Sequence, residues 1–599
     1  MATTYSEDHP DFVNAGRGFV GTISPATITD AAGNVVFDAD ALAFVTGETP
    51  DTVDPSLWRQ AKLTGRHGLY EVAPGFSQVR GFDISNMTLV EGDTGVIVID
   101  PLVSAECAAA GLALYREHRG DRPVTAVIYT HAHIDHFGGV LGVVDADTDV
   151  PIVAPEHFLE HAVSENVYAG VAMLRRGYYY DGHPLDATPE GSVGIGLGPR
   201  ASAGTIGLIP PTLDITRTGQ EETLDGVRFV FQLTPNTESP AEMNFFFPDH
   251  RVLCMAENAT HVMHNLLTLR GAQVRDSRIW SRYLAEAVEL FAHDADVVFS
   301  SHHWPTWGSD AIIDFLTDQR DLYAYMHDQT LRLMNQGYVG AEIAEMLPMP
   351  ASLKDAWSTR GYYGSLSHNV KAIFQRYLGW YDGNPAHLWQ HPPEVQAARY
   401  VELLGGVDKV VEAVDRYADA GDLRFAAELG SHAVFADPTN APAREALANV
   451  LERLGLGAEN ATWRNCFLTG AHELRGGHPA GFVSSAGMVS ALTVTQLFDT
   501  IAIRLDGAKA AGTTASIRWE LTDSGETYRM ELSNGALVHF PTRRDDSADV
   551  TVQLTKAQLL GLLGSASLDG IDVEGDASVL TTLLALTDEP DPMFHVVEP

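Results

Sequence analysis

The sequence predicts a layered α/β domain over residues 66–310, then an all-α region and a C-terminal α+β domain. Short apolar runs alternate with helical patterns in the first region, which is typical of sheets covered by helices. Helical periodicity dominates from about residue 311 to 470, and strand-like segments return after a glycine-rich stretch near residue 476. At roughly 100–200 residues per domain, a chain of 599 residues has room for three domains.

The first 65 residues are mixed in composition and rich in turn formers, so we expect a peripheral extension there. Helices are expected at Ala105–His118 and Ser277–His293. The strands expected around them are 96–99, 124–129, 227–233, 243–247, 251–255 and 296–300. Catalytic groups in such domains gather where strands end in loops, so the strand ends are the places to search for a site.

The middle region shows helical periodicity without an exact repeat, as in stacked helical hairpins. Helices are expected at 312–334, 340–345, 407–420, 423–435 and 441–454. This region either packs against a second copy of itself or is a plain helical appendage.

Gly476–Gly481 has the composition of a linker. Beyond it we expect helices at 494–505, 555–563 and 578–586 and strands at 514–521, 527–532 and 536–540. The predicted domain boundaries are therefore 1–310, 311–475 and 485–599.

Charge and composition exclude several classes of partner. There are 39 Lys and Arg residues against 79 Asp and Glu residues, a net charge of −40, whereas nucleic-acid binders carry basic surfaces. Three isolated cysteines form no disulfide framework. No apolar run reaches the ~18 residues of a membrane span, and the N-terminus lacks a signal-peptide pattern, so a cytoplasmic location is expected.

The strongest motif is Thr130–Gly139, in which three histidines and one aspartate fall within six residues directly after an apolar strand. Imidazole and carboxylate are the usual zinc ligands where no thiolate is present. His131 and His133 are spaced to point into one cavity. Asp135 and His136, at the start of an expected helix, are placed to reach a second ion. The motif therefore predicts two adjacent metal ions.

This HxHxDH pattern is the signature of the metallo-β-lactamase superfamily, and the resemblance implies an αββα sandwich. The superfamily usually adds a histidine, a bridging aspartate and a last histidine. This chain differs, because it has no histidine between His183 and His250, and His250 lies in a turn. Glu238 and Glu257 instead follow expected strands, and His302 ends a third one.

Glutamates at these two positions are typical of the alkylsulfatase branch of the superfamily, which the stretches 260–266, 268–271 and 301–308 also resemble. The resemblance implies two zinc ions per chain, one held by His131, His133 and Glu238, the other by Asp135, His136 and His302, with Glu257 as the bridge. Glu242 and His303 remain open as alternative ligands. Carboxylate-rich sites also suit manganese or iron.

The same resemblance implies hydrolysis of alkyl sulfate esters, such as dodecyl sulfate, by a hydroxide that the two zinc ions activate, with Asp135 and Glu257 as catalytic groups. By motif match, Asn265 and Arg270 bind the sulfate, and the planar arginine fork suits an oxyanion. Tyr363 and His368 are candidates for the general acid, and Tyr178, Tyr179 and Tyr180 are candidates for the pocket wall. Attack at carbon or at sulfur, and primary or secondary esters, remain open.

The helical region resembles the dimerisation domain of alkylsulfatases, which implies a homodimer, and the last domain resembles the sterol-carrier-protein type of lipid-binding fold. Two other functions are alternatives to alkyl sulfate hydrolysis. Another hydrolase on the same fold, such as a thioesterase, is disfavoured by the glutamates and by the Asn265 and Arg270 pair. A lipid-binding or scaffold protein with an inactive metal site is disfavoured by the complete ligand set.

Overall fold

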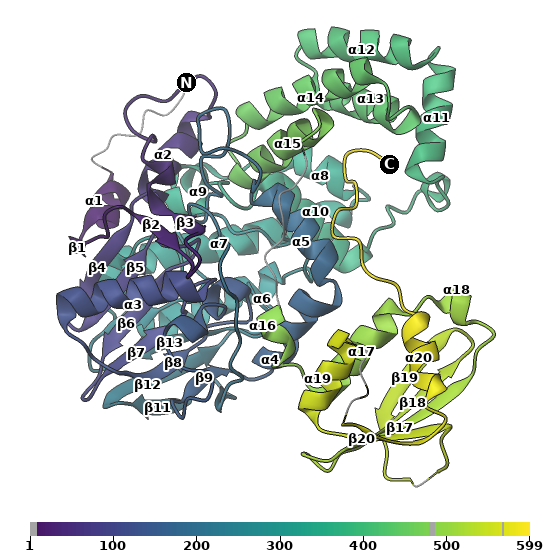
Figure 1. Cartoon of the computed structure of the whole chain (residues 1–599). Helices are drawn as coiled ribbons and strands as arrows, with labels where there is room; N and C mark the ends of the chain where they lie inside the picture. The colour runs from purple at the N-terminus through teal and green to yellow at the C-terminus, as the bar shows by residue number, and fades with distance from the viewer. Residues whose placement is uncertain (1–8, 478–485, 545, 566–567, 569) are drawn as a thin grey trace. The chain divides into compact units, whose positions relative to one another are not determined.

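The computed structural model describes residues 9–477, 486–544, 546–565, 568 and 570–599 (Figure 1). These residues form two compact units. The first comprises the described parts of 1–162, 173–483 and 593–599, and the second those of 163–172 and 484–592. Among the described residues, no helix has both the length and the apolar character needed to cross a membrane.

Two sheets pack face to face in the first unit. The eight-stranded sheet contains, in spatial order, β1 (Phe19–Gly21), β4 (Gly68–Ala73), β5 (Phe76–Arg80), β6 (Met87–Glu91), β7 (Val96–Ile99), β8 (Val124–Ile128), β9 (Ile152–Pro155) and β10 (Leu213–Ile215). The six-stranded sheet contains β11 (Glu221–Leu224), β12 (Val227–Leu233), β13 (Met243–Phe247), β14 (Val252–Cys254), β15 (Val297–Phe299) and β16 (Thr306–Trp307). A two-stranded sheet, β2 (Thr27–Thr29) and β3 (Val35–Asp38), lies apart.

The alternation of side chains along β13 shows how both faces of a strand are buried. Phe245 and Phe247 pack into the core between the two sheets, together with Phe229 of β12. Phe246, which points the other way, packs among the helices outside the six-stranded sheet. This follows from the two-residue period of a strand. A run of apolar residues on one strand therefore serves two hydrophobic layers.

Helices cover the outer face of each sheet. α3 (Ala105–Arg119) contacts β4 and β5 of the larger sheet. α6 (Ser277–Ala287), α7 (Ser309–Met334) and α10 (Leu366–Leu378) share a core with the smaller one, around the buried Trp280. The predicted αββα sandwich is confirmed (Figure 1). The remaining helices of this part are α1 (Pro10–Gly16), α4 (Phe158–Val163), α5 (Gly170–Tyr180), α8 (Gly340–Met346) and α9 (Ala351–Asp355).

The expectation of a peripheral N-terminal extension was wrong for α2 (Pro55–Thr64), which is almost wholly buried. Gln60 accepts a hydrogen bond from Trp357 Nε1 at 2.7 Å and donates one to Gly196 O at 3.0 Å. The polar residues of this helix made it look exposed in the sequence. Their hydrogen-bond partners lie more than a hundred residues away, so no local pattern predicts the burial.

The helical region of the first unit has its own hydrophobic core, which includes Val414, Ala433 and Leu447. Its helices are α11 (Pro393–Leu403), α12 (Val407–Asp419), α13 (Leu423–Ala436), α14 (Ala441–Leu456) and α15 (Ala461–Leu474). The three expected helices over 407–454 are confirmed, whereas α11 and α15 were not predicted. Arg464 of α15 is buried and donates to the carbonyl oxygens of Thr52, Pro189 and Gly191, which joins the region to the sandwich.

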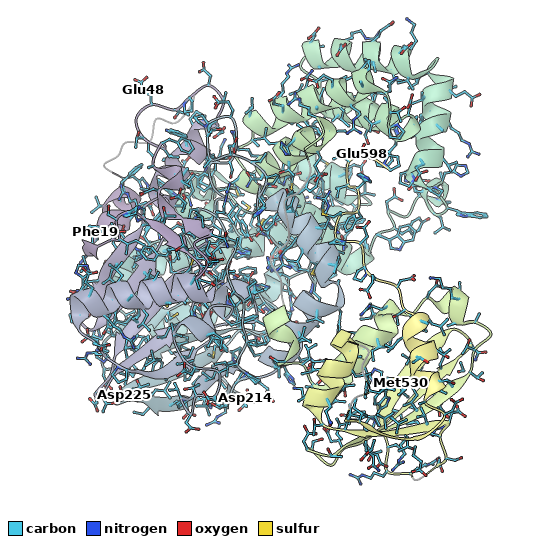
Figure 2. All side chains as sticks on the ribbon, viewed as in Figure 1. Phe19, Glu48, Asp214, Asp225, Met530 and Glu598 are labelled. Carbon is cyan, nitrogen blue, oxygen red and sulfur yellow. The ribbon has the colours of Figure 1, made fainter. Side chains whose placement is uncertain are left out.

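The second unit is an α+β domain, as predicted. Its sheet has the order β19 (Ala536–Pro541), β18 (Thr527–Ser533), β17 (Ala515–Leu521), β20 (Val550–Leu554) and β21 (Asp572–Gly575). Its helices are α16 (Ala486–Val489), α17 (Val494–Arg504), α18 (Gly507–Ala510), α19 (Lys556–Ser565) and α20 (Ser578–Ala585). Met530, labelled in Figure 2, is fully buried in β18. Strands β20 and β21 were not predicted, and residues 478–481 of the expected linker lie outside the described residues.

Residues 593–599 belong to the first unit rather than to the domain that precedes them. Glu598, also labelled in Figure 2, forms an ion pair with Arg444 of α14. Val597 packs against the helical core. The end of the chain thus returns to the helical region.

Candidate metal centre

The site lies where the two sheets meet at the ends of their strands. Met243 N donates to Thr130 O at 3.0 Å, and an isolated bridge pairs His131 with Glu242. Several turns that follow these strands contain non-glycine residues with positive φ angles, namely Asp100 at 54°, Asn236 at 65°, Ala256 at 45° and His303 at 63°. Such backbone strain is concentrated at functional sites, where the surrounding structure maintains it.

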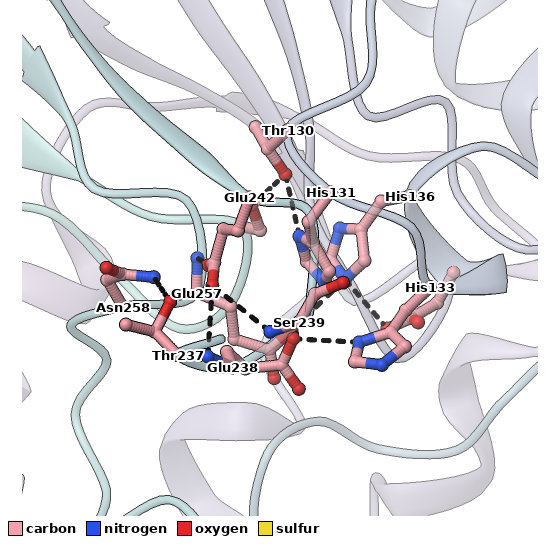
Figure 3. Close-up of polar contacts among 12 residues, drawn as sticks. Thr130, His131, His133, His136, Thr237, Glu238, Ser239, Glu242, Glu257 and Asn258 are labelled. Atoms are coloured by element: carbon pink, nitrogen blue, oxygen red, sulfur yellow. Dashed lines mark hydrogen bonds and ion pairs between the residues drawn. The ribbon is translucent and has the colours of Figure 1, made fainter. Parts of the chain in front are cut away.

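His131, His133, Glu238 and Glu257 form one group of potential metal ligands, all of them buried. Glu238 Oε2 lies 3.2 Å from His131 Nε2 and 2.8 Å from His133 Nδ1. Figure 3 shows these side chains converging from the loop after β8 and from the loops of the smaller sheet.

Asp135, His136, Glu257 and His302 form the second group. Asp135 Oδ2 lies 3.1 Å from His136 Nε2 and 3.5 Å from His302 Nε2. Residues 134–136 form a single 3-10 turn rather than the start of a longer helix, which still directs Asp135 and His136 toward this group. The structure therefore brings together all seven residues that the sequence motifs single out as ligands.

Glu257 belongs to both groups. Its Oε2 atom lies 3.3 Å from His131 Nε2, 3.2 Å from His136 Nε2 and 3.2 Å from His302 Nε2. One carboxylate oxygen thus faces three imidazole nitrogens that come from two separate groups. This is the geometry required of a residue that bridges two ions.

The donor atoms fit bound metal. Zinc–nitrogen and zinc–oxygen bonds of ~2.0–2.2 Å place tetrahedral ligand atoms about 3.3–3.6 Å apart, and the separations above run from 2.8 to 3.5 Å. His131 Nε2, His136 Nε2, His302 Nε2 and Glu238 Oε2 are buried and have no hydrogen-bond partner among the described residues. Buried polar atoms are normally paired, so this convergence indicates a cation.

Three of the four imidazoles that point into the site have a partner at their other ring nitrogen. Thr130 Oγ1 lies 2.9 Å from His131 Nδ1, Asp100 Oδ2 lies 3.0 Å from His136 Nδ1, and Ile84 O lies 3.0 Å from His302 Nδ1. Asp100 Oδ2 also accepts hydrogen bonds from Thr130 Oγ1 at 2.8 Å and Ser301 Oγ at 2.7 Å. Partners of this kind fix the tautomer and the orientation of a ligating histidine.

The side chains of Glu242 and His303, the two alternative ligands, form hydrogen bonds with other groups of the protein. Glu242 accepts hydrogen bonds from the backbone of Glu238, Ser239 and Glu257 and from Thr237 Oγ1, and so shapes the ligand loops. His303 Nδ1 accepts from His261 N at 3.1 Å, and its Nε2 lies 3.0 Å from Gly196 O. Burial lowers the pKa of His303 to about 3, so this ring is uncharged at neutral pH.

Two residues of the site were missed by sequence analysis. His264 Nε2 lies 2.7 Å from Glu257 Oε1, and the buried Arg275 forms an ion pair with Glu238 Oε1. Burial alone would raise the pKa of Glu238, but the Arg275 charge and the histidines lower it to about 2. His264 stands in a stretch that resembles the alkylsulfatases, whereas nothing around Arg275 marks it.

Of the two residues expected to bind substrate, Asn265 is connected to the ligand Glu238 through Arg275. Asn265 Oδ1 accepts hydrogen bonds from Arg275 Nη1 and, at 3.2 Å, from Thr268 Oγ1. Arg270 Nη1 donates to Gly271 O at 3.2 Å and contacts Met173 Sδ at 3.6 Å. Asp181 follows α5, and burial raises its pKa to about 7. The positive charge of Arg270 acts in the opposite direction and lowers this pKa. Arg270 is therefore close to the end of α5.

Of the two candidates for the general acid, the structure places Tyr363 nearer to the metal groups. Its ring lies 4.9 Å from the ring of His264, and its hydroxyl lies 2.6 Å from the hydroxyl of Tyr180. Burial raises the pKa of Tyr363, so its phenol keeps its proton. His368 Nδ1 accepts from Trp463 Nε1 at 3.2 Å, and burial lowers the pKa of His368 to about 3.

The other two tyrosines of α5 do not share this arrangement. The Tyr179 hydroxyl donates a hydrogen bond to Glu473 Oε2, on α15. The ring of Tyr178 packs against His183, with centroids 5.4 Å apart. Tyr180 is the tyrosine of α5 that contacts Tyr363, through the hydroxyl pair described above.

Comparison with known proteins agrees with this site. Residues 80–302 match the model of the metallo-β-lactamase superfamily, 339–477 that of alkyl sulfatase dimerisation and 483–599 that of the alkyl sulfatase C-terminal domain. A linear primary-alkylsulfatase of Pseudomonas sp is 44% identical over 99% of this chain and 90% of its own length. The alkyl/aryl-sulfatase BDS1 of Saccharomyces cerevisiae is 45% identical, over 99% of this chain and 94% of its own.

Among solved structures, the stereoselective inverting sec-alkylsulfatase Pisa1 from Pseudomonas sp. is 42% identical with a TM-score of 0.96, covering 99% of this chain and 96% of its own. The chain belongs to the alkylsulfatase family of the metallo-β-lactamase superfamily.

Replacing Asp100 tests the support behind the second group. In Asp100→Asn the carboxylate that faces His136 Nδ1 is replaced by a neutral amide, so the ring is less basic and less well oriented. We expect metal affinity to fall about 10–100-fold, measured by competition with a chelator. Asp294→Asn, at an exposed position, is the matched control and should bind metal like the unmodified protein. Equal affinity in both variants would show that Asp100 has no role in metal binding.

Proposed function

We propose that this protein hydrolyses alkyl sulfate esters, such as dodecyl sulfate, to the alcohol and inorganic sulfate. The observations that carry the proposal are the Glu257 oxygen shared between two groups of ligands and Arg275, which connects the ligand Glu238 to Asn265. The two nearly full-length relatives described above bear the names of alkylsulfatases, which supports the same substrate class.

The metal that best suits the donors is zinc, with two ions per chain. His131, His133 and Glu238 would hold one ion, Asp135, His136 and His302 the other, and Glu257 would bridge them. Histidine nitrogens mixed with carboxylates are a common zinc environment when thiolates are absent. Bound zinc supplies Lewis acidity and lowers the pKa of water from about 15.7 toward about 7.

The sulfate group is bound by Asn265 and Arg270 in this proposal. Because Arg275 and Thr268 hold the Oδ1 atom of Asn265, the NH₂ end of its side chain is directed to donate to a sulfate oxygen. Arg270 adds a positive charge and a planar pair of donors, a geometry that matches an oxyanion. Arg275 is a positioning residue, since it contacts Glu238 and Asn265 together.

Tyr363 is the residue we propose to supply a proton to the alkoxide that leaves when sulfur is attacked and the S–O bond breaks. Its raised pKa keeps the hydroxyl protonated, and an alkoxide leaving group is basic enough to take that proton. Tyr180, 2.6 Å away, positions the phenol. His368 is the weaker candidate, because its ring contacts Trp463 and stays uncharged at neutral pH.

The other parts of the chain have proposed roles as well. We assign residues 1–310 to the catalytic domain, 311–475 to a dimerisation domain and 485–599 to a sterol-carrier-protein-like domain. The model of alkyl sulfatase dimerisation, matched by residues 339–477, supports the second assignment. The α+β order of elements supports the third.

Sulfate release from dodecyl sulfate tests the proposed activity. We expect release by the zinc-loaded protein, loss of release with a chelator, and a decrease of about 10²–10³-fold in Arg270→Ala, as when one oxyanion donor is removed. Arg251→Ala, which removes an exposed arginine paired with Asp296, should retain full activity. The absence of sulfate release from both primary and secondary esters would contradict the proposal and make thioesters the next substrates to test.

The proposed homodimer is tested at the exposed apolar residues between α10 and α12. Trp389 is 97% exposed, Leu403 80% and Trp380 77%, which is unusual for large apolar side chains in a monomer. We expect the unmodified protein to have twice the chain mass in light scattering. In the double variant Trp380→Ser/Trp389→Ser we expect a weaker dimer, with a higher dissociation constant for the two chains. The control Phe540→Ser, in the second unit, should leave that constant unchanged. A monomeric unmodified protein would contradict the dimer.

A further inference from the structure

A small cavity lies beside the loop that follows β15. Its wall includes Arg66, Arg80, Asp83, His303 and Trp304. The cavity leaves about 20 Å³ for the centre of a water-sized particle. Since about 10–15 Å³ of such space holds one water molecule, the cavity has room for a single small particle.

Arg80 is the unusual member of this wall. Only 6% of the residue is exposed, and its Nε and Nη2 atoms are buried without a hydrogen-bond partner in the part of the chain that the structure describes. Its guanidinium carbon lies 3.4 Å from the centre of the Tyr70 ring, a contact that attracts the cation but supplies no negative charge. Burial lowers the pKa of Arg80 to about 10, so the group remains charged at neutral pH.

Asp83 is the acidic residue of the cavity wall, but its oxygen atoms are used elsewhere. Oδ1 accepts from Ile84 N at 2.8 Å and Ser202 N at 2.9 Å, and Oδ2 accepts from Ser202 Oγ at 2.6 Å. Burial raises the pKa of Asp83 to about 6, the opposite of what a paired arginine would do. No ion pair between an acidic residue and Arg80 is present among residues 9–477.

Arg66 brings a second guanidinium to the same wall. Its Nη1 atom donates to Phe12 O at 3.0 Å, and its charge is near enough to oppose that of Arg80. Two neighbouring cations, one of them buried with unpaired donors, require a compensating anion, because a buried charge is costly unless it is paired.

We propose that this cavity binds one monatomic anion of the halide class, chloride under ordinary conditions, between Arg66 and Arg80. Water would satisfy the unpaired donors but not the charge. A tetrahedral anion such as sulfate exceeds the available space, which separates this site from the proposed substrate site. Because His303 and Trp304 line the cavity, the anion stabilises the loop that also carries His302, whatever the substrate of the metal centre is.

Halide dependence of stability and bromide diffraction together test the proposal. The zinc-loaded full chain is melted in sodium chloride and in sodium gluconate at equal ionic strength. Ligand linkage predicts a melting temperature that rises with the logarithm of chloride concentration above the dissociation constant, and remains lower in gluconate. Crystals grown in bromide should give an anomalous peak between Arg66 and Arg80.

Arg80→Met retains the apolar stem and removes the charge, so we expect both the chloride dependence and the bromide peak to be lost. Arg251→Met, at an exposed position, should keep both. If Arg80→Met does not fold, the unmodified protein still decides the question. Equal melting temperatures in chloride and gluconate, or no bromide peak in this cavity, would overturn the proposal. A bromide peak without any effect of chloride on the melting temperature would also overturn the proposal, because the ion would then bind only at crystal concentration.

Discussion

The structure depends on the convergence of one buried carboxylate with three buried imidazoles. Glu257 Oε2 faces nitrogen atoms of His131, His136 and His302 within 3.3 Å, and all four residues are buried. The Nε2 atoms of these three histidines are buried without hydrogen-bond partners among the described residues, which is costly unless a cation lies among them. The two-sheet sandwich makes this convergence possible, because it brings together the ends of strands that are far apart in the sequence.

The residues behind the ligands limit the freedom of that arrangement. Asp100 holds His136 and, through Ser301, the start of the loop that contains His302. Arg275 joins Glu238 to Asn265, so a single side chain connects a ligand of the first group with the proposed sulfate site. Such double contacts explain why an arginine is buried here, since its charge is paired and its donors are used.

Local patterns allowed much of the fold and site to be predicted. The HxHxDH motif follows one strand, and its spacing alone indicates two ions. Glu238, Glu257 and His302 lie more than a hundred residues further on, and were assigned because the surrounding stretches resemble the alkylsulfatases. Burial of α2 was predicted wrongly, since its polar residues find partners that no local pattern reveals. Arg275 was missed for the same reason, because its role exists only once the chain has folded.

The measurement that tests the central claim most directly is anomalous diffraction at the zinc edge from crystals of the metal-loaded protein. The account predicts two peaks per chain on either side of Glu257, one among His131, His133 and Glu238 and the other among Asp135, His136 and His302. It also predicts that Glu257→Gln weakens both peaks. A single peak, or peaks that do not involve Glu257, would contradict the shared-carboxylate site on which the rest of the account depends.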